Sequence, residues 1–164
     1  MQGMSLIVKS MTRLVAGFIA LFGVYIVLYG HVTPGGGFTG GVILAGGMVL
    51  VVLAFGEKFS RQVLTHGVAQ ASDSIAALVF LLVALGGYMV GGIACRFFYN
   101  FLGRGTVGEL FSAGTIPISN LAIGIKVGVG LFGVFLALAV FRRLGERSLM
   151  EPEEADEQLG AHLL

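Results

Sequence analysis

The stretch Gly30-His31-Val32-Thr33-Pro34-Gly35-Gly36-Gly37-Phe38-Thr39-Gly40-Gly41 decides how this chain folds. It holds six of the chain's 27 glycines, one of its three prolines and one of its three histidines. Long apolar runs lie on both sides of it, so it interrupts an otherwise continuous hydrophobic segment. We interpret it as the connection between two helices, which can serve as a site, a hinge or a turn.

The composition is that of an integral membrane protein. Of the 164 residues, 56% are hydrophobic and 12% are charged, and the mean hydropathy is +0.94. Roughly a quarter of the residues of a soluble domain are charged. The net charge of +1 excludes a nucleic-acid footprint. The single cysteine, Cys95, excludes an internal disulfide and a cysteine-based zinc site.

Four apolar runs predict transmembrane helices, because each is long enough to cross a hydrocarbon core of about 30 Å. They cover residues 12–29, 38–55, 75–94 and 119–141. Between the second and third runs, residues 59–72 predict a loop, and Ser72-Asp73-Ser74 resembles a helix N-cap. We therefore expect an all-α membrane protein.

The domain organisation follows from the same runs. Residues 1–145 predict a single membrane domain, and residues 146–164 predict a cytoplasmic tail. The tail contains the acidic, proline-broken stretch 151–157, which is typical of a disordered segment.

The basic residues predict the orientation in the membrane. With four spans, one side of the membrane carries seven of them, namely Lys9, Arg13, Lys58, Arg61, Arg142, Arg143 and Arg147. The other side carries only Arg96 and Arg104. The positive-inside rule then places both termini in the cytoplasm and the glycine-rich loop outside.

Lys126 is the strongest single candidate for function. It lies seven residues into the predicted span 119–141, and a charge in mid-membrane costs about 2.5–3.5 kcal/mol on insertion scales. Its helix face is otherwise lined by small residues, namely Ser119, Ala122, Gly130, Gly133 and Ala137. Such a face leaves room for water or for a neighbouring helix. Lys126 predicts a polar path or an ion pair, and the alternative is that its stem lifts the ammonium group to the outer interface.

Three further ionisable residues are candidates for an ion or proton path. His31 follows the first span, where the alternative role is to cap the last helical carbonyls. Glu109 lies in the predicted outer segment, and its alternative is a solvated carboxylate. Asp73 is either an N-cap or a cytoplasmic port for protons or cations. His66 and His162 lie far from His31 in sequence, so no metal site is predicted.

The glycines of the opening stretch predict close helix packing rather than phosphate binding. No Gly-Lys-Ser/Thr follows them, so the stretch is not a P-loop. Residues expected at the helix entry or in helix contacts are Pro34, Gly35, Gly36, Gly37, Gly40, Gly41, Gly124 and Gly128. Glycines four residues apart let helix backbones meet. The sequence has no nucleophile–base arrangement and no paired carboxylates within a span, so we expect neither an enzyme nor a bound cofactor.

Two blocks carry a family resemblance. Residues 30–45 resemble the hallmark of the MrpB/MnhB component of multisubunit cation/proton antiporters (the Mrp or Mnh family). Gly108-Glu109-Leu110-Phe111-Ser112-Ala113-Gly114-Thr115-Ile116-Pro117, then Asn120 and Gly124-Ile125-Lys126-Val127-Gly128, resemble a second block. The resemblance covers about residues 10–143, and Ser119 departs from the aliphatic residue expected there.

The resemblance implies an accessory subunit of a complex that exchanges sodium ions for protons across a prokaryotic plasma membrane. Its partners would be other membrane subunits, the bilayer and the transported ions. Related modules in membrane-bound hydrogenases and sulfur reductases are the alternative host. His31, Pro34 and Lys126 are the residues to which the resemblance gives a role. A purely structural subunit remains a second hypothesis, and a stand-alone transporter is not expected.

Overall fold

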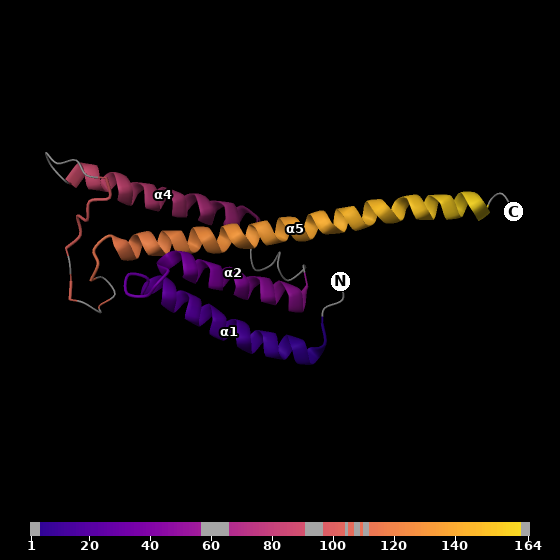
Figure 1. Cartoon of the computed structure of the whole chain (residues 1–164), viewed down its shortest axis with the longest axis horizontal. Helices are drawn as coiled ribbons and strands as arrows, with labels where there is room; N and C mark the ends of the chain where they lie inside the picture. Colours follow the sequence, from indigo (N-terminus) through magenta and orange to yellow (C-terminus); the bar gives the residue numbers. More distant parts are fainter. Residues whose placement is uncertain are drawn as a thin grey trace. The chain divides into compact units, whose positions relative to one another are not determined.

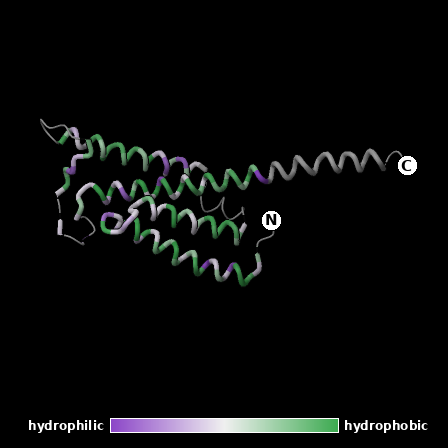
Figure 2. The backbone as a smooth tube through the Cα atoms, in the orientation of Figure 1, coloured by the Kyte–Doolittle hydropathy of each residue, from purple (hydrophilic) through white to green (hydrophobic). Residues whose placement is uncertain are grey.

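The structure, a computed structural model, describes residues 4–56, 66–90, 97–103, 105–106, 109 and 112–161. These residues form four α-helices, labelled in Figure 1: α1 (Leu6–Leu28), α2 (Gly36–Phe55), α4 (His66–Val90) and α5 (Ile116–Ala161). Each contains a segment long and apolar enough to cross a membrane, and Figure 2 shows how apolar residues dominate them. The prediction of an all-α membrane protein with four spans is confirmed.

The chain divides into two units, residues 1–132 and 133–164, and the boundary falls within α5. The first unit holds α1, α2, α4 and the beginning of α5, and it contains every residue of the site described below. The prediction that residues 1–145 form one domain stays a prediction.

The start of α4 corrects the sequence analysis. Residues 66–72, expected at the end of a loop, are helical, so Asp73 lies seven residues inside the helix and the N-cap prediction is wrong. Ala69, Gln70 and Ala71 favour the helix, and Asp73 finds an ion-pair partner on another helix. Residues 91–94, the end of the predicted third span, lie outside the described residues.

The other ends of the spans also extend further than predicted. α1 begins at Leu6 rather than at residue 12, and the guanidinium of Arg13 lies 5.6 Å from the centre of the Phe55 ring of α2. α5 continues through Ala161, so the prediction of a disordered tail is wrong within residues 146–161. The tail is rich in Glu, Ala and Leu, which are strong helix formers, and Pro152 removes only one backbone donor.

The connection between α1 and α2 is a tight turn. The backbone N–H groups of Val32 and Thr33 both donate to the carbonyl of Tyr29, at 2.9 and 3.0 Å. Gly35 and Gly36 then have φ angles of +94° and +53°. Residues with a side chain rarely adopt these angles, so the two glycines let the chain reverse and enter α2 within a few residues.

Close glycine contacts hold α2 between α1 and α5. A Cβ added to Gly40 would lie 2.9 Å from the carbonyl oxygen of Gly23 in α1. A Cβ added to Gly41 would lie 2.7 Å from the carbonyl oxygen of Gly124 in α5, and one added to Gly37 would overlap the backbone of Asn120. The three helices therefore pack backbone against backbone on these faces.

The described part of the segment before α5 is held by Asn100. Its amide group donates to the carbonyl of Ala113 at 3.2 Å and accepts from the N–H of Thr115 at 3.1 Å. Gly114, with φ at +67°, packs directly against this side chain. Next to it, Phe98 contacts Phe80 of α4, with the ring centres 5.2 Å apart. These contacts fix the entry to α5.

Candidate functional site

An ion pair within the membrane joins α4 to α5. The ammonium of Lys126 donates to the carboxylate oxygen Oδ1 of Asp73 at 2.8 Å. Lys126 lies ten residues after Ile116, the first residue of α5, which is about 15 Å along the helix. Asp73 lies seven residues, or about 10 Å, inside α4. Both charged groups therefore belong to spanning segments rather than to loops.

This chain covers the ion pair only in part. The side chains of Lys126 and Asp73 are 48% and 40% exposed. Beside them, Ala122 on α5 and Ala76 on α4 are buried, so small residues let the two helices approach closely below the pair. The pair is thus anchored on one side and open on the other.

The open side gives the pair chemical capacity. An ammonium group has three donors and Asp73 takes one of them in the bond described. The carboxylate likewise has acceptor positions beyond the one used. The remaining positions can hold water or a polar group of another chain. A charged group at this depth is costly without such partners.

His31 makes a second contact between distant parts of the chain. Its Nε2 lies 3.1 Å from the backbone carbonyl oxygen of Glu109, so this nitrogen carries the proton and donates. The carbonyl of Glu109 also accepts from the N–H of Ser112 at 3.2 Å. The imidazole stacks on Tyr29, with ring centres 6.4 Å apart. His31 thus ties the glycine-rich loop to the segment that leads into α5.

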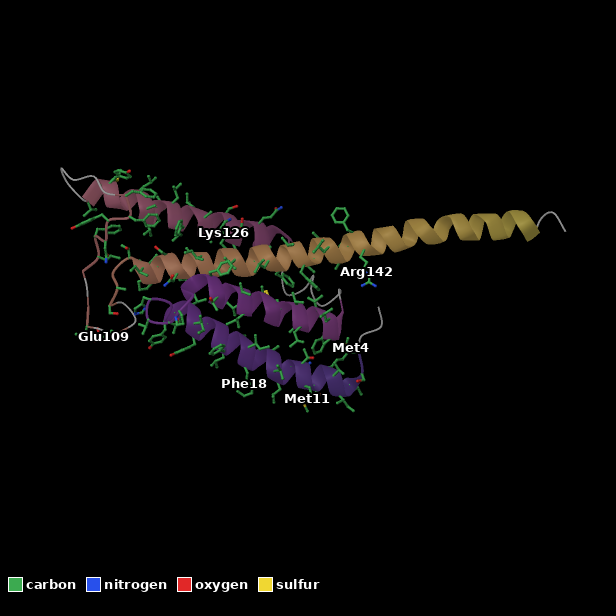
Figure 3. All side chains as sticks on the ribbon, viewed as in Figure 1. Met4, Met11, Phe18, Glu109, Lys126 and Arg142 are labelled. Atoms are coloured by element: carbon green, nitrogen blue, oxygen red, sulfur yellow. The ribbon has the colours of Figure 1, made fainter. Side chains whose placement is uncertain are left out.

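The four ionisable candidates therefore form two separate pairs. Lys126 meets Asp73, whereas His31 meets the backbone of Glu109 rather than its carboxylate. Figure 3 shows Glu109 at the end of the bundle where the glycine-rich loop lies and Lys126 well along α5. The glycine-rich loop does not reach the lysine, and Pro34 lies exposed within the loop.

Asn120 is the residue near the site to which sequence analysis gave no role. Its Oδ1 accepts from the N–H of Gly37 at 3.4 Å, and its Nδ2 is buried against Gly30. It therefore holds both ends of the glycine-rich loop onto α5. The available signal was an amide side chain inside an apolar span, because polar residues there require a partner. The described residues contain no group of three His, Cys, Asp or Glu side chains that could hold a metal ion.

Comparison with known proteins follows this geometry. Residues 7–133 match the family model described as a domain related to the MnhB subunit of the Na+/H+ antiporter. The chain belongs to the MnhB family. The matched residues include both ion-pair partners, His31, and all of α1, α2 and α4.

Individual MnhB relatives differ in length. The MnhB-type subunit of the Na+/H+ antiporter of Bacillus subtilis is 30% identical over 86% of this chain and 93% of its own length. An uncharacterised protein of Methanocaldococcus jannaschii is 34% identical over 76% of this chain and 48% of its own length. This chain thus spans about half of that archaeal relative.

A solved structure is also similar. A chain of the membrane-bound sulfane sulfur reductase, an archaeal respiratory membrane complex, is 37% identical, with a TM-score of 0.64. The match covers 80% of this chain and 56% of that chain. The MnhB fold therefore occurs both under an antiporter name and within a respiratory complex.

Proposed function

We propose that this MnhB-family chain is an accessory membrane subunit of a multisubunit sodium/proton antiporter complex. In this proposal the Lys126–Asp73 pair forms part of the hydrated path for ions or protons. The observation that carries it is the half-exposed ion pair between two spanning helices. The family membership and the name of the Bacillus subtilis relative support the antiporter assignment.

The division of the candidates into two pairs assigns them different tasks. Lys126 and Asp73 have unused donors and acceptors at membrane depth, as a path for charge requires. His31 and the backbone of Glu109 close the loop end of the bundle and keep α5 in register with α2. In this proposal the subunit carries out no chemical reaction itself.

The proposal includes a location and an orientation. The chain lies in the plasma membrane of a prokaryote, with both termini in the cytoplasm and the glycine-rich loop outside. The excess of basic residues on one side supports this orientation. The partners are other membrane subunits, and the transported species are sodium ions and protons.

A second candidate is the equivalent subunit of a respiratory complex. The 37% identity to a chain of the sulfane sulfur reductase favours it, compared with 30% to the Bacillus subtilis antiporter protein. Mass spectrometry of the subunits that co-purify with this chain distinguishes the two hosts. Antiporter subunits alone support the first candidate, and redox subunits support the second.

The path role is tested by the variant Lys126→Met in the assembled complex. Methionine keeps the length of the side chain but removes the charge, so Asp73 loses its partner and the path loses a donor. We expect at least about a tenfold loss of sodium-driven proton movement, equivalent to about 1.4 kcal/mol. The measurement is a pH-sensitive dye in proteoliposomes that contain the purified complex.

Two matched variants complete this test. Lys126→Arg keeps the charge and should retain more transport than Lys126→Met. Lys9→Met removes a lysine near the start of α1 and should leave transport unchanged. Full transport by an intact Lys126→Met complex would contradict the path role and favour a purely structural subunit.

A further inference from the structure

The open side of the ion pair defines a surface on the first unit of the chain. We call Lys126 and Gly130 of α5, together with Asp73 of α4, the pair surface. Gly130 lies one turn after Lys126, so the two residues share a helix face. Nothing lies within 4 Å of the position that a Cβ on Gly130 would occupy. The pair surface is therefore shallow as well as polar.

Lipid is a poor neighbour for this surface. Half of each charged side chain is uncovered, and hydrocarbon offers no donor or acceptor to an ammonium or a carboxylate. The lipid-like face of the chain is different in kind. On α1, Phe18 is 68% exposed, and Figure 3 shows its side chain directed away from the other helices. Large apolar side chains cover that face, whereas the pair surface has none.

The two glycine faces of α5 show what kind of group fits. Gly124 and Gly128 lie against α2, where Gly41 contacts both of them. Gly130 lies about 200° around the helix from Gly128, at about 100° per residue, and has no such neighbour. A second helix can therefore approach α5 at Gly130 as closely as α2 does at Gly128.

The charges of the pair restrict the side chain that such a helix presents. Lys126 and Asp73 neutralise each other, so an added carboxylate would repel Asp73 and an added cation would repel Lys126. A neutral side chain that both donates and accepts, such as Ser, Thr, Asn or Gln, satisfies the free positions of both groups without adding charge.

We propose that the pair surface is the docking site for a transmembrane helix of a neighbouring subunit. That helix presents small residues to Gly130 and one neutral hydrogen-bonding side chain to the Lys126–Asp73 pair. This inference rests on the proposed function in one respect only, namely that the chain works inside a multisubunit membrane complex.

The test is the variant Gly130→Leu, with Gly17→Leu as its matched control. Gly17 is also a helical glycine with nothing within 4 Å of an added Cβ, but it lies on α1. We expect Gly130→Leu to lower the amount of neighbouring subunits that co-purify with this chain at least tenfold. Gly17→Leu should lower it less than twofold. Equal co-purification with the two variants would overturn the proposal.

A cysteine variant tests the same surface without added bulk. In a Cys95→Ser background, Gly130→Cys in the native complex should form a cross-link with a neighbouring subunit when a short bifunctional maleimide is added. Phe18→Cys should form none. A product that contains only a second copy of this chain, or no product from Gly130→Cys, would overturn the proposal.

These outcomes separate the docking site from the path. If Gly130→Leu releases the neighbours while the Lys126→Met complex transports normally, the docking site stands and the path role fails. If Gly130→Leu assembles fully while Lys126→Met abolishes transport, the docking site fails and the path role stands.

Discussion

Lys126 and Asp73 show how a charge can be accommodated within a span. Each residue alone is a cost to membrane insertion, and their separation of 53 positions hides the partnership in the sequence. The apolar surroundings of Lys126 were enough to single it out. Its partner could not be identified from sequence, because Asp73 lies between two serines, which is the typical setting of an N-cap.

His31 and Glu109 illustrate a different limit. Sequence analysis selected both because their side chains ionise, but the bond joins an imidazole to a backbone carbonyl. Every residue has such a carbonyl, so no pattern of side chains predicts which one is used. The structure therefore transfers the contact from the carboxylate of Glu109 to its main chain.

This assignment predicts opposite results for two substitutions. His31→Ala removes the donor, and a hydrogen bond of this kind contributes about 0.5–1.5 kcal/mol. We expect amide hydrogen exchange in residues 112–116 to become about two- to tenfold faster as a result. Glu109→Ala keeps the carbonyl and should leave exchange unchanged. Equal acceleration in both variants would contradict the main-chain assignment.

At the scale of helices, the sequence predicted the existence and type of the four spans well. Long apolar runs allow few alternatives in a membrane, since unpaired backbone groups are not tolerated there. The helix ends were less predictable. α4 begins at His66 and α5 continues through Ala161, and in both places polar helix formers extend the helix beyond its apolar run.

The packing of α2 against α5 gives a prediction for Gly37. A Cβ at this position would overlap the backbone of Asn120, which cannot rotate away as a side chain would. Gly37→Ala should therefore lower the free energy of unfolding by about 1–3 kcal/mol, the usual cost of overpacking. The measurement is the thermal unfolding midpoint of the purified complex.

Gly17→Ala is the control for that measurement. It adds the same methyl group at a helical position with open space around it, and alanine favours a helix over glycine. We expect its midpoint to be equal to or above that of the unmodified protein. Midpoints that fall equally in both variants would mean that contact with Asn120 is not the cause.

At the scale of the whole molecule, the orientation in the membrane is open to a direct test. In a Cys95→Ser background, Val32→Cys places a thiol in the turn between α1 and α2, where Val32 is exposed. A membrane-impermeant maleimide should label it in intact cells, because the basic residues predict that this turn lies outside.

Met4→Cys is the counterpart on the other side. Met4 is exposed just before α1, and its cysteine should react with the same reagent only after the cells are made permeable. The reverse pattern, with labelling of Met4→Cys in intact cells and protection of Val32→Cys, would invert the proposed orientation.

The distance along the chain between Asp73 and Lys126 also has a consequence for biosynthesis. The two residues are 53 positions apart, and ribosomes add about 5–20 residues per second. For about 3–10 s after Asp73 is made, its partner does not yet exist. The insertion machinery must therefore shelter α4 until α5 emerges, and any change that delays translation between the two helices lengthens the time during which a nascent carboxylate waits at the translocon.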